Sequence, residues 1–208
     1  MAITRTATLR YGSFLLAASL LAGLAGCSEA PFLSGQPTES STPVPEATDP
    51  GEVEIIINDL STGSAMHELE AGAIGLNVVY YSDLTMDKWT AEANKPVTLS
   101  LKADLGKDQG QKIYLSRVTA TTAVAGPNGA LAAPEPSVDS ATVSPGYYVK
   151  NPYSYSTTFI LPAVDPAATS ITLSITYEML LQTTKTSKSY SKQTASDTLT
   201  IAIAQPAE

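Results

Sequence analysis

The most constraining feature of this chain is a regular alternation of apolar and mostly polar side chains near its carboxy terminus. From Ile171 to Gln182 the odd-numbered residues are apolar or aromatic, and most even-numbered ones are polar. A period of two places successive side chains on opposite faces, which predicts a half-buried β-strand. Thr198–Ile203 alternates in the same way, and the polar segment Thr183–Ser196 is predicted to be a loop. We therefore expect the two strands to pair as an antiparallel hairpin.

Further segments have the composition of short strands. Val97, Leu99 and Leu101 alternate with polar residues. Five other segments are rich in β-branched or aromatic residues: Val53–Asn58, Leu76–Ser82, Lys112–Val124, Val138–Val143 and Ser154–Leu161. Turn-forming Gly and Pro residues separate them, and Ser64–Ala71 is faintly helical. About eight short strands predict an all-β fold, an antiparallel β-sandwich that occupies residues 53–208.

The spacing of these strands resembles that of immunoglobulin and fibronectin type III domains, although the Cys-Trp-Cys pattern of immunoglobulins is absent. The resemblance implies an immunoglobulin-like sandwich, and at this level it implies no function. Trp89 is the only tryptophan. We expect its large apolar ring to lie in the core rather than on a ligand-binding surface.

The amino terminus has the features of a targeting signal. Arg5 and Arg10 precede an apolar stretch, about residues 12–26, that is shorter than the ~20 residues of a membrane-spanning helix. The stretch ends in Leu24-Ala25-Gly26-Cys27, which resembles the lipobox of bacterial lipoproteins. The resemblance implies that residues 1–26 are a signal peptide and that Cys27 carries a diacylglycerol as the mature amino terminus. The alternative is an ordinary secretory signal, for which residues 22–26 offer only a loose cleavage pattern.

Residues 27–52 have the composition of a tether. Prolines recur among Ser, Thr, Glu and Gly, so this segment cannot bury enough apolar surface to fold, and we expect it to be disordered. Its root-mean-square span would be roughly 25–30 Å. Together with a diacylglycerol on Cys27, which suffices for stable anchorage, it places the domain at the cell membrane on the extracytoplasmic side.

The composition excludes several classes of function. The chain has 12 Lys and Arg against 20 Asp and Glu, a net charge of -8, so we expect no nucleic-acid partner. It has one histidine and one cysteine, and it lacks the common catalytic and phosphate-binding motifs. We therefore expect no metal, no cofactor and no enzymatic activity. His67 lies beside Glu68 and Glu70 and is expected to be a solvated surface residue.

Four tyrosines gather between Pro145 and Tyr155, namely Tyr147, Tyr148, Tyr153 and Tyr155. Tyrosine has a flat apolar face and a polar tip, which suits contact with sugars and peptides. These four are the candidate ligand-binding residues. The alternative is structural: Tyr153 and Tyr155 would alternate into the core with Phe159, while Tyr147 and Tyr148 would cover a sheet edge.

A second segment, with Lys185, Lys188, Tyr190 and Lys192, forms a local cationic patch. It can contact an anionic polymer or lipid headgroups, or its lysines can simply keep a hairpin from associating edge to edge. The sequence as a whole predicts a lipid-anchored module that binds an envelope glycan, peptide or protein. One alternative is a structural or assembly subunit of an envelope complex. Another is a hydrolase based on paired carboxylates, whose spacing a sequence does not reveal.

Overall fold

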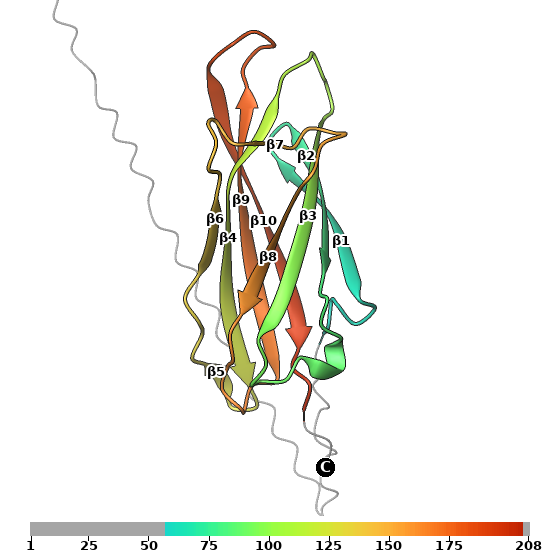
Figure 1. Ribbon diagram of the computed structural model, residues 1–208, viewed down its shortest axis with the longest axis vertical. Helices are drawn as coiled ribbons and strands as arrows, with labels where there is room; N and C mark the ends of the chain where they lie inside the picture. Colours follow the sequence, from blue (N-terminus) through green and yellow to red (C-terminus); the bar gives the residue numbers. More distant parts are fainter. Residues whose placement is uncertain (1–56, 206–208) are drawn as a thin grey trace, which may run out of the picture. The chain divides into compact units, whose positions relative to one another are not determined.

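The computed structural model describes residues 57–205 (Figure 1). The predicted signal peptide, Cys27, the tether and most of the predicted strand Val53–Asn58 lie outside the described residues. Within them, Ile57 and Asn58 precede a turn and are not part of a strand.

Two antiparallel sheets face each other (Figure 1). The first sheet has the order β1-β2-β3-β8, formed by β1 (Ser64–Ala71), β2 (Ile74–Tyr81), β3 (Lys95–Leu105) and β8 (Tyr155–Leu161). The second has the order β10-β9-β4, formed by β10 (Tyr190–Ala202), β9 (Ser170–Gln182) and β4 (Ile113–Gly126). Three short strands pair with the free edge of β4, namely β5 (Gly129–Leu131), β6 (Ser137–Ser140) and β7 (Tyr147–Tyr148). The predicted antiparallel β-sandwich is confirmed, with ten strands in the described residues.

The order of the central strands resembles that of immunoglobulin domains. The chain passes from β3 to β4 and from β8 to β9 between the sheets, while β3 lies beside β8 and β4 beside β9. The order β2-β3-β8 against β10-β9-β4 therefore corresponds to strands A-B-E and G-F-C of immunoglobulin domains. β1 extends the first sheet beyond β2.

The core lies between the inward faces of the two sheets. Alternate residues of β2, β3 and β9 are buried, as the period-two pattern predicts, and they meet side chains from the opposite sheet. Trp89 is fully buried in this core, as expected from the sequence. It follows the short 3-10 helix η1 (Met86–Lys88), and its indole Nε1 donates to Ser82 Oγ and to the Leu84 carbonyl, each at 3.2 Å.

Two of the sequence-based predictions are wrong in their details. Ser64–Ala71 is not helical but forms β1, which pairs with β2 over all eight of its residues. Its Met, Glu, Leu and Ala residues favour helices, and the pairing overrides that preference. The predicted loop Thr183–Ser196 is also too long, because β10 already begins at Tyr190. Polar residues such as Ser191 and Lys192 are tolerated there since β10 is an edge strand.

Smaller differences concern the short strands. The predicted strand Val138–Val143 corresponds to β6, which ends at Ser140, and the sequence pattern missed β5 and β7. The hairpin between β9 and β10 is confirmed, with paired residues from Tyr190 and Gln182 to Ala202 and Ser170. Within residues 57–205, no helix has the length and hydrophobicity needed to cross a membrane.

Candidate functional site

The segment that carries the predicted tyrosines connects the two sheets at one side of the sandwich. Val149 is fully buried, and its N–H donates to the Ile113 carbonyl of the second sheet at 3.1 Å. The Val149 carbonyl accepts from the Ala103 N–H of the first sheet at 2.9 Å, and the Asn151 N–H donates to the Ala103 carbonyl, also at 2.9 Å. The backbone around Val149 is therefore fixed to both sheets, which gives the adjacent tyrosines a rigid support.

Gly146 is required by the close approach of this segment to β4. A Cβ placed on Gly146 would lie 2.5 Å from the Leu115 carbonyl oxygen and 3.2 Å from Tyr114 Cβ. Any side chain would therefore push the segment away from β4. The absence of a side chain at Gly146 allows Tyr147 and Tyr148 to pair with Leu115 and Tyr114 as strand β7.

Tyr147 and Tyr155 form one pair, which packs against the core. Their rings are stacked, with centroids 4.6 Å apart and an angle of 12° between the planes. The Tyr155 hydroxyl donates to the Asp139 carboxylate of β6. Burial and this hydrogen bond raise the pKa of Tyr155 well above its usual value. These two residues join β8 to β6 and β7 across the side of the sandwich, so their role is structural.

Tyr148 and Tyr153 point outward and belong to a longer row of rings. The exposed fraction is 36% for Tyr148 and 58% for Tyr153, and their centroids are 5.0 Å apart. Tyr114 of β4 lies 5.6 Å from Tyr148, and Tyr190 of β10 lies 5.7 Å from Tyr114. We call Tyr114, Tyr148, Tyr153 and Tyr190 the tyrosine face. The alternative prediction, in which Tyr153 alternates into the core with Tyr155 and Phe159, is wrong for Tyr153, because its side chain is exposed.

Strand register explains why the rings come together. Tyr148 is opposite Tyr114, Tyr114 is opposite Leu180, and Leu180 is opposite Lys192. Residues directly opposite in antiparallel strands share one face of a sheet, so this row lies on the outward face of the second sheet. In the next row Arg117 is opposite Glu178, whose carboxylate is 2.8 Å from Lys192 Nζ. The tyrosine face is thus bordered by a charged row.

The tyrosine face lies at the opposite end of the sandwich from the point where the described chain begins. Near that beginning, Asp59 exchanges two hydrogen bonds with Thr200: its N–H donates to the Thr200 carbonyl, and its carboxylate accepts from the Thr200 N–H. Tyr190 lies ten residues earlier in β10, which is about 33 Å along a strand. Figure 1 shows the start of β1 and the end of β10 at the lower end, and β7 at the upper end.

A further ion pair connects the tyrosine segment to the loop between β3 and β4. Lys150 Nζ is 2.6 Å from the Asp108 carboxylate and also donates to the Gln111 carbonyl at 3.0 Å. The hydrogen bond from Lys150 and one from the Gly110 N–H hold the pKa of Asp108 below its usual value. Asp108 therefore stays ionised and positions Lys150 between the two loops.

His67 is not the solvated surface residue that the sequence predicts. Its side chain is 30% exposed, and its Nδ1 lies 2.7 Å from Asp197 Oδ2 of β10. Its sequence neighbours Glu68 and Glu70 lie on the other face of β1, because side chains alternate along the strand. His67 and Asp197 join the edge strand of one sheet to the edge strand of the other.

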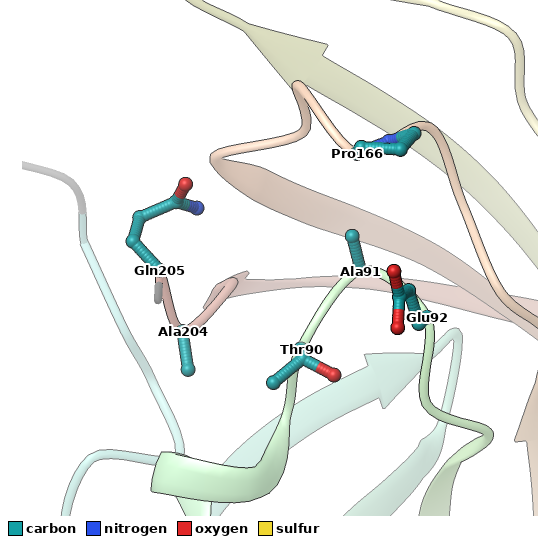
Figure 2. A pocket seen from close by; sticks show the side chains of 6 residues that line it. All are labelled: Thr90, Ala91, Glu92, Pro166, Ala204 and Gln205. Atoms are coloured by element: carbon teal, nitrogen blue, oxygen red, sulfur yellow. The ribbon is translucent and has the colours of Figure 1, made fainter. Parts of the chain in front are cut away.

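A hollow of about 230 Å³ lies at the end of the sandwich away from the tyrosine face. Figure 2 shows Thr90, Ala91 and Glu92 from the segment before β3 facing Ala204 and Gln205 beyond β10, with Pro166 nearby. Of the six described residues that line this hollow, only Glu92 has an ionisable side chain. Paired carboxylates are therefore missing from its described lining. Within residues 57–205, no three His, Cys, Asp or Glu side chains are grouped so that they could hold a metal ion.

Comparison with known proteins matches the chain to no family model and to no curated protein. The sequence identified Tyr148 and Tyr153, but it missed Tyr114 and treated Tyr190 as part of a separate patch. Their proximity follows from pairing between strands that are distant in the sequence.

Proposed function

We propose that this protein is a lipid-anchored, extracytoplasmic module that binds a component of the cell envelope, without catalysis, through its tyrosine face. The observation that carries the proposal is the convergence of Tyr114, Tyr148, Tyr153 and Tyr190 from three separate segments into one partly exposed row. Rigid aromatic side chains provide contact area at a low cost in conformational entropy. Monomeric soluble proteins rarely expose a continuous apolar patch, so a continuous row of rings at the surface favours binding.

The position of the face supports the same proposal. The lipobox resemblance predicts an anchor at Cys27, and the predicted tether joins the domain near Asp59. The tyrosine face lies at the other end of β10, about 33 Å away along the strand. Because the predicted tether joins the opposite end, it does not cover the tyrosine face, which is free to contact envelope material within the reach of the tether.

The alternative of an assembly subunit requires a large continuous apolar surface. In the part of the chain that the structure describes, the exposed large aliphatic side chains are distributed over different elements, for example Met66 on β1, Val138 on β6 and Ile160 on β8. The aromatic row is the more continuous surface. This comparison favours ligand binding over assembly.

A sedimentation experiment tests the proposal. The full-length protein, solubilised in a neutral detergent, is mixed with the detergent-insoluble envelope fraction of the cells that produce it. We expect the protein to sediment with this fraction and the double variant Tyr148→Ala/Tyr153→Ala to remain in solution. Tyr81→Ala is the matched control, because Tyr81 is a half-buried tyrosine at the end of β2 in the other sheet. Equal sedimentation of all three proteins would show that the tyrosine face does not bind the envelope.

A further inference from the structure

Lysines gather at the same end of the sandwich as the tyrosine face. Lys112 immediately precedes β4, and its backbone joins Gln182 at the end of β9 through hydrogen bonds of 2.9 and 3.2 Å. Lys185 lies over the loop between β3 and β4, since its Cδ would be 3.1 Å from a Cβ on Gly110. Lys188 follows in the same β9–β10 loop, two residues before Tyr190. Figure 1 shows both loops at the upper end, beside β7.

The charge of this end contrasts with that of the chain. The whole protein has a net charge of -8. Here, however, lysines outnumber carboxylates: Lys107, Lys112, Lys150, Lys185, Lys188 and Lys192 accompany Glu70, Asp104, Asp108 and Glu178. Asp108 and Glu178 are paired with Lys150 and Lys192. Among the described residues, exposed Lys112, Lys185 and Lys188 form no ion pair, so they create a local positive potential that attracts anions.

The angles between the rings limit which ligand shapes can contact all of them. Neighbouring planes in the tyrosine face are turned by 54°, 56° and 84° relative to one another. Rings turned in this way cannot lie flat on one planar surface together. They can contact successive units of a single chain that twists along its length. The apolar faces of sugar rings stack on tyrosine, and tyrosine hydroxyls bond to sugar hydroxyls.

We propose that the tyrosine face binds a single chain of an acidic polysaccharide, whose carboxylate or phosphate groups are held by Lys112, Lys185 and Lys188. This inference rests on the proposed function and adds the chemical class of the ligand. The tyrosine segment and the lysine-containing loop before Tyr190 form one surface. Tyr114 connects them, because its ring contacts Tyr190 on one side and Tyr148 on the other. The rings select a saccharide, and the lysines select a negatively charged one.

The test compares polygalacturonate with its fully methyl-esterified form, which has the same sugar backbone without charge. We expect the full-length protein in neutral detergent to bind polygalacturonate at least about tenfold more tightly than the ester, and this difference to shrink as salt is added. The variant Lys185→Gln/Lys188→Gln should bind polygalacturonate roughly threefold to tenfold more weakly. Lys88→Gln, an exposed lysine in η1 at the opposite end, should bind as the wild type does.

Other results would overturn the inference in distinguishable ways. Equal binding of both polymers, unaffected by the lysine substitutions, would reject an acidic ligand while leaving glycan binding in place. Equally tight binding to polyglutamate, insensitive to Tyr148→Ala/Tyr153→Ala, would show attraction by charge alone. Binding to neither polymer, when the protein still sediments with the envelope fraction through its tyrosines, would reject the acidic polysaccharide but not the proposed function.

Discussion

The hydroxyl of Tyr80 donates a 2.6 Å hydrogen bond to the carboxylate of Asp197, and this bond connects the two sheets. The same Asp197 oxygen accepts from His67 Nδ1 at 2.7 Å. Because the single hydrogen of Tyr80 is directed to Asp197, the Tyr177 hydroxyl, 2.7 Å away, donates to the Tyr80 oxygen. On the other side of the sandwich, Tyr155 donates to Asp139. Each side is thus joined by a carboxylate that accepts from a tyrosine of the opposite sheet.

Removing the Asp197 carboxylate should weaken the contact between the sheets. Asp197→Ala leaves the hydroxyls of Tyr80 and Tyr177 with one acceptor too few in a buried site, which costs about 1–3 kcal/mol of the free energy of unfolding. Asp197→Asn keeps an acceptor oxygen and should cost less. Denaturant unfolding measures both, with the exposed Glu68→Ala as control. A stability of Asp197→Ala equal to that of the control would refute this role.

Alkaline pH should destabilise the fold through its buried tyrosines. Burial is the main cause that raises the pKa of Tyr80 and of Tyr177, so the folded state keeps both protons while the unfolded chain loses them above about pH 10. Stability is then unaffected below pH 10 and falls by about 1.4 kcal/mol per pH unit for each such tyrosine above it. Unfolding measured from pH 8 to 11 tests this, and Tyr80→Phe should reduce the slope. If the unfolding free energy changed with pH equally with and without the Tyr80 hydroxyl, Tyr80 would not be a cause of the alkaline destabilisation.

Lys95 should be required for the structure of the segment before β3. Its side chain is fully buried, and its Nζ donates to the carbonyls of Thr90, Ala91 and Ala93 at 3.1, 3.2 and 2.6 Å. Burial lowers the pKa of Lys95. Lys95→Met keeps most of the side-chain volume but removes the donor, so we expect a loss of about 1–3 kcal/mol in unfolding free energy.

The control for this variant is Lys102→Met, since Lys102 is an exposed lysine of the same strand. Amide hydrogen exchange provides a local readout: Lys95→Met should increase exchange at Ala93 and Val164, whose N–H groups bond within or next to this segment. Unchanged exchange at both amides would mean that the structure of this segment does not depend on the hydrogen bonds from Lys95.

Gly146→Ala should displace the tyrosine segment from β4. The new Cβ would meet the Leu115 carbonyl oxygen at 2.5 Å, a contact that requires backbone movement. We expect a cost of about 1–3 kcal/mol, as for other overpacked sites, together with weaker binding through Tyr148. Gly106→Ala is the matched control, because a Cβ there meets no atom within 4 Å. If Gly146→Ala behaved as Gly106→Ala does, the support of Tyr148 by the pairing of β7 with β4 would be disproved.

Local patterns predicted the fold where one face of a strand is buried and the other is solvated. The alternation in β9 predicted both that it is a strand and which face is buried, and a similar alternation predicted β3. β8 was predicted from its β-branched and aromatic composition. The pattern failed in β1, where Glu68, Leu69 and Glu70 have helical preferences and only pairing with β2 decides the conformation. It also failed in β7, because two residues are too few for a period and the strand exists only through its pairing with β4.

The candidate site was only partly predictable for the same reason. A cluster in the sequence identified Tyr148 and Tyr153, but it could not separate them from Tyr147 and Tyr155, which pack against the core. Tyr114 joins the face because β4 pairs with β7, and Tyr190 joins it through the register of β9 with β4 and β10. His67 and Asp197 are 130 residues apart, so no local pattern could reveal their contact.

Lipid attachment at Cys27 is the remaining prediction, and it determines where the tyrosine face is displayed. Leu24-Ala25-Gly26-Cys27 resembles a lipobox, and the thiol is the nucleophile that accepts the lipid, so Cys27→Ser cannot be modified. We expect the wild type in the membrane fraction, with an intact mass that begins at Cys27 and includes a diacylglycerol. The variant should keep residues 1–26 and lack the lipid. If the wild type were instead unmodified and soluble in the cytoplasm, the anchor, the tether and the extracytoplasmic function built on them would all be refuted.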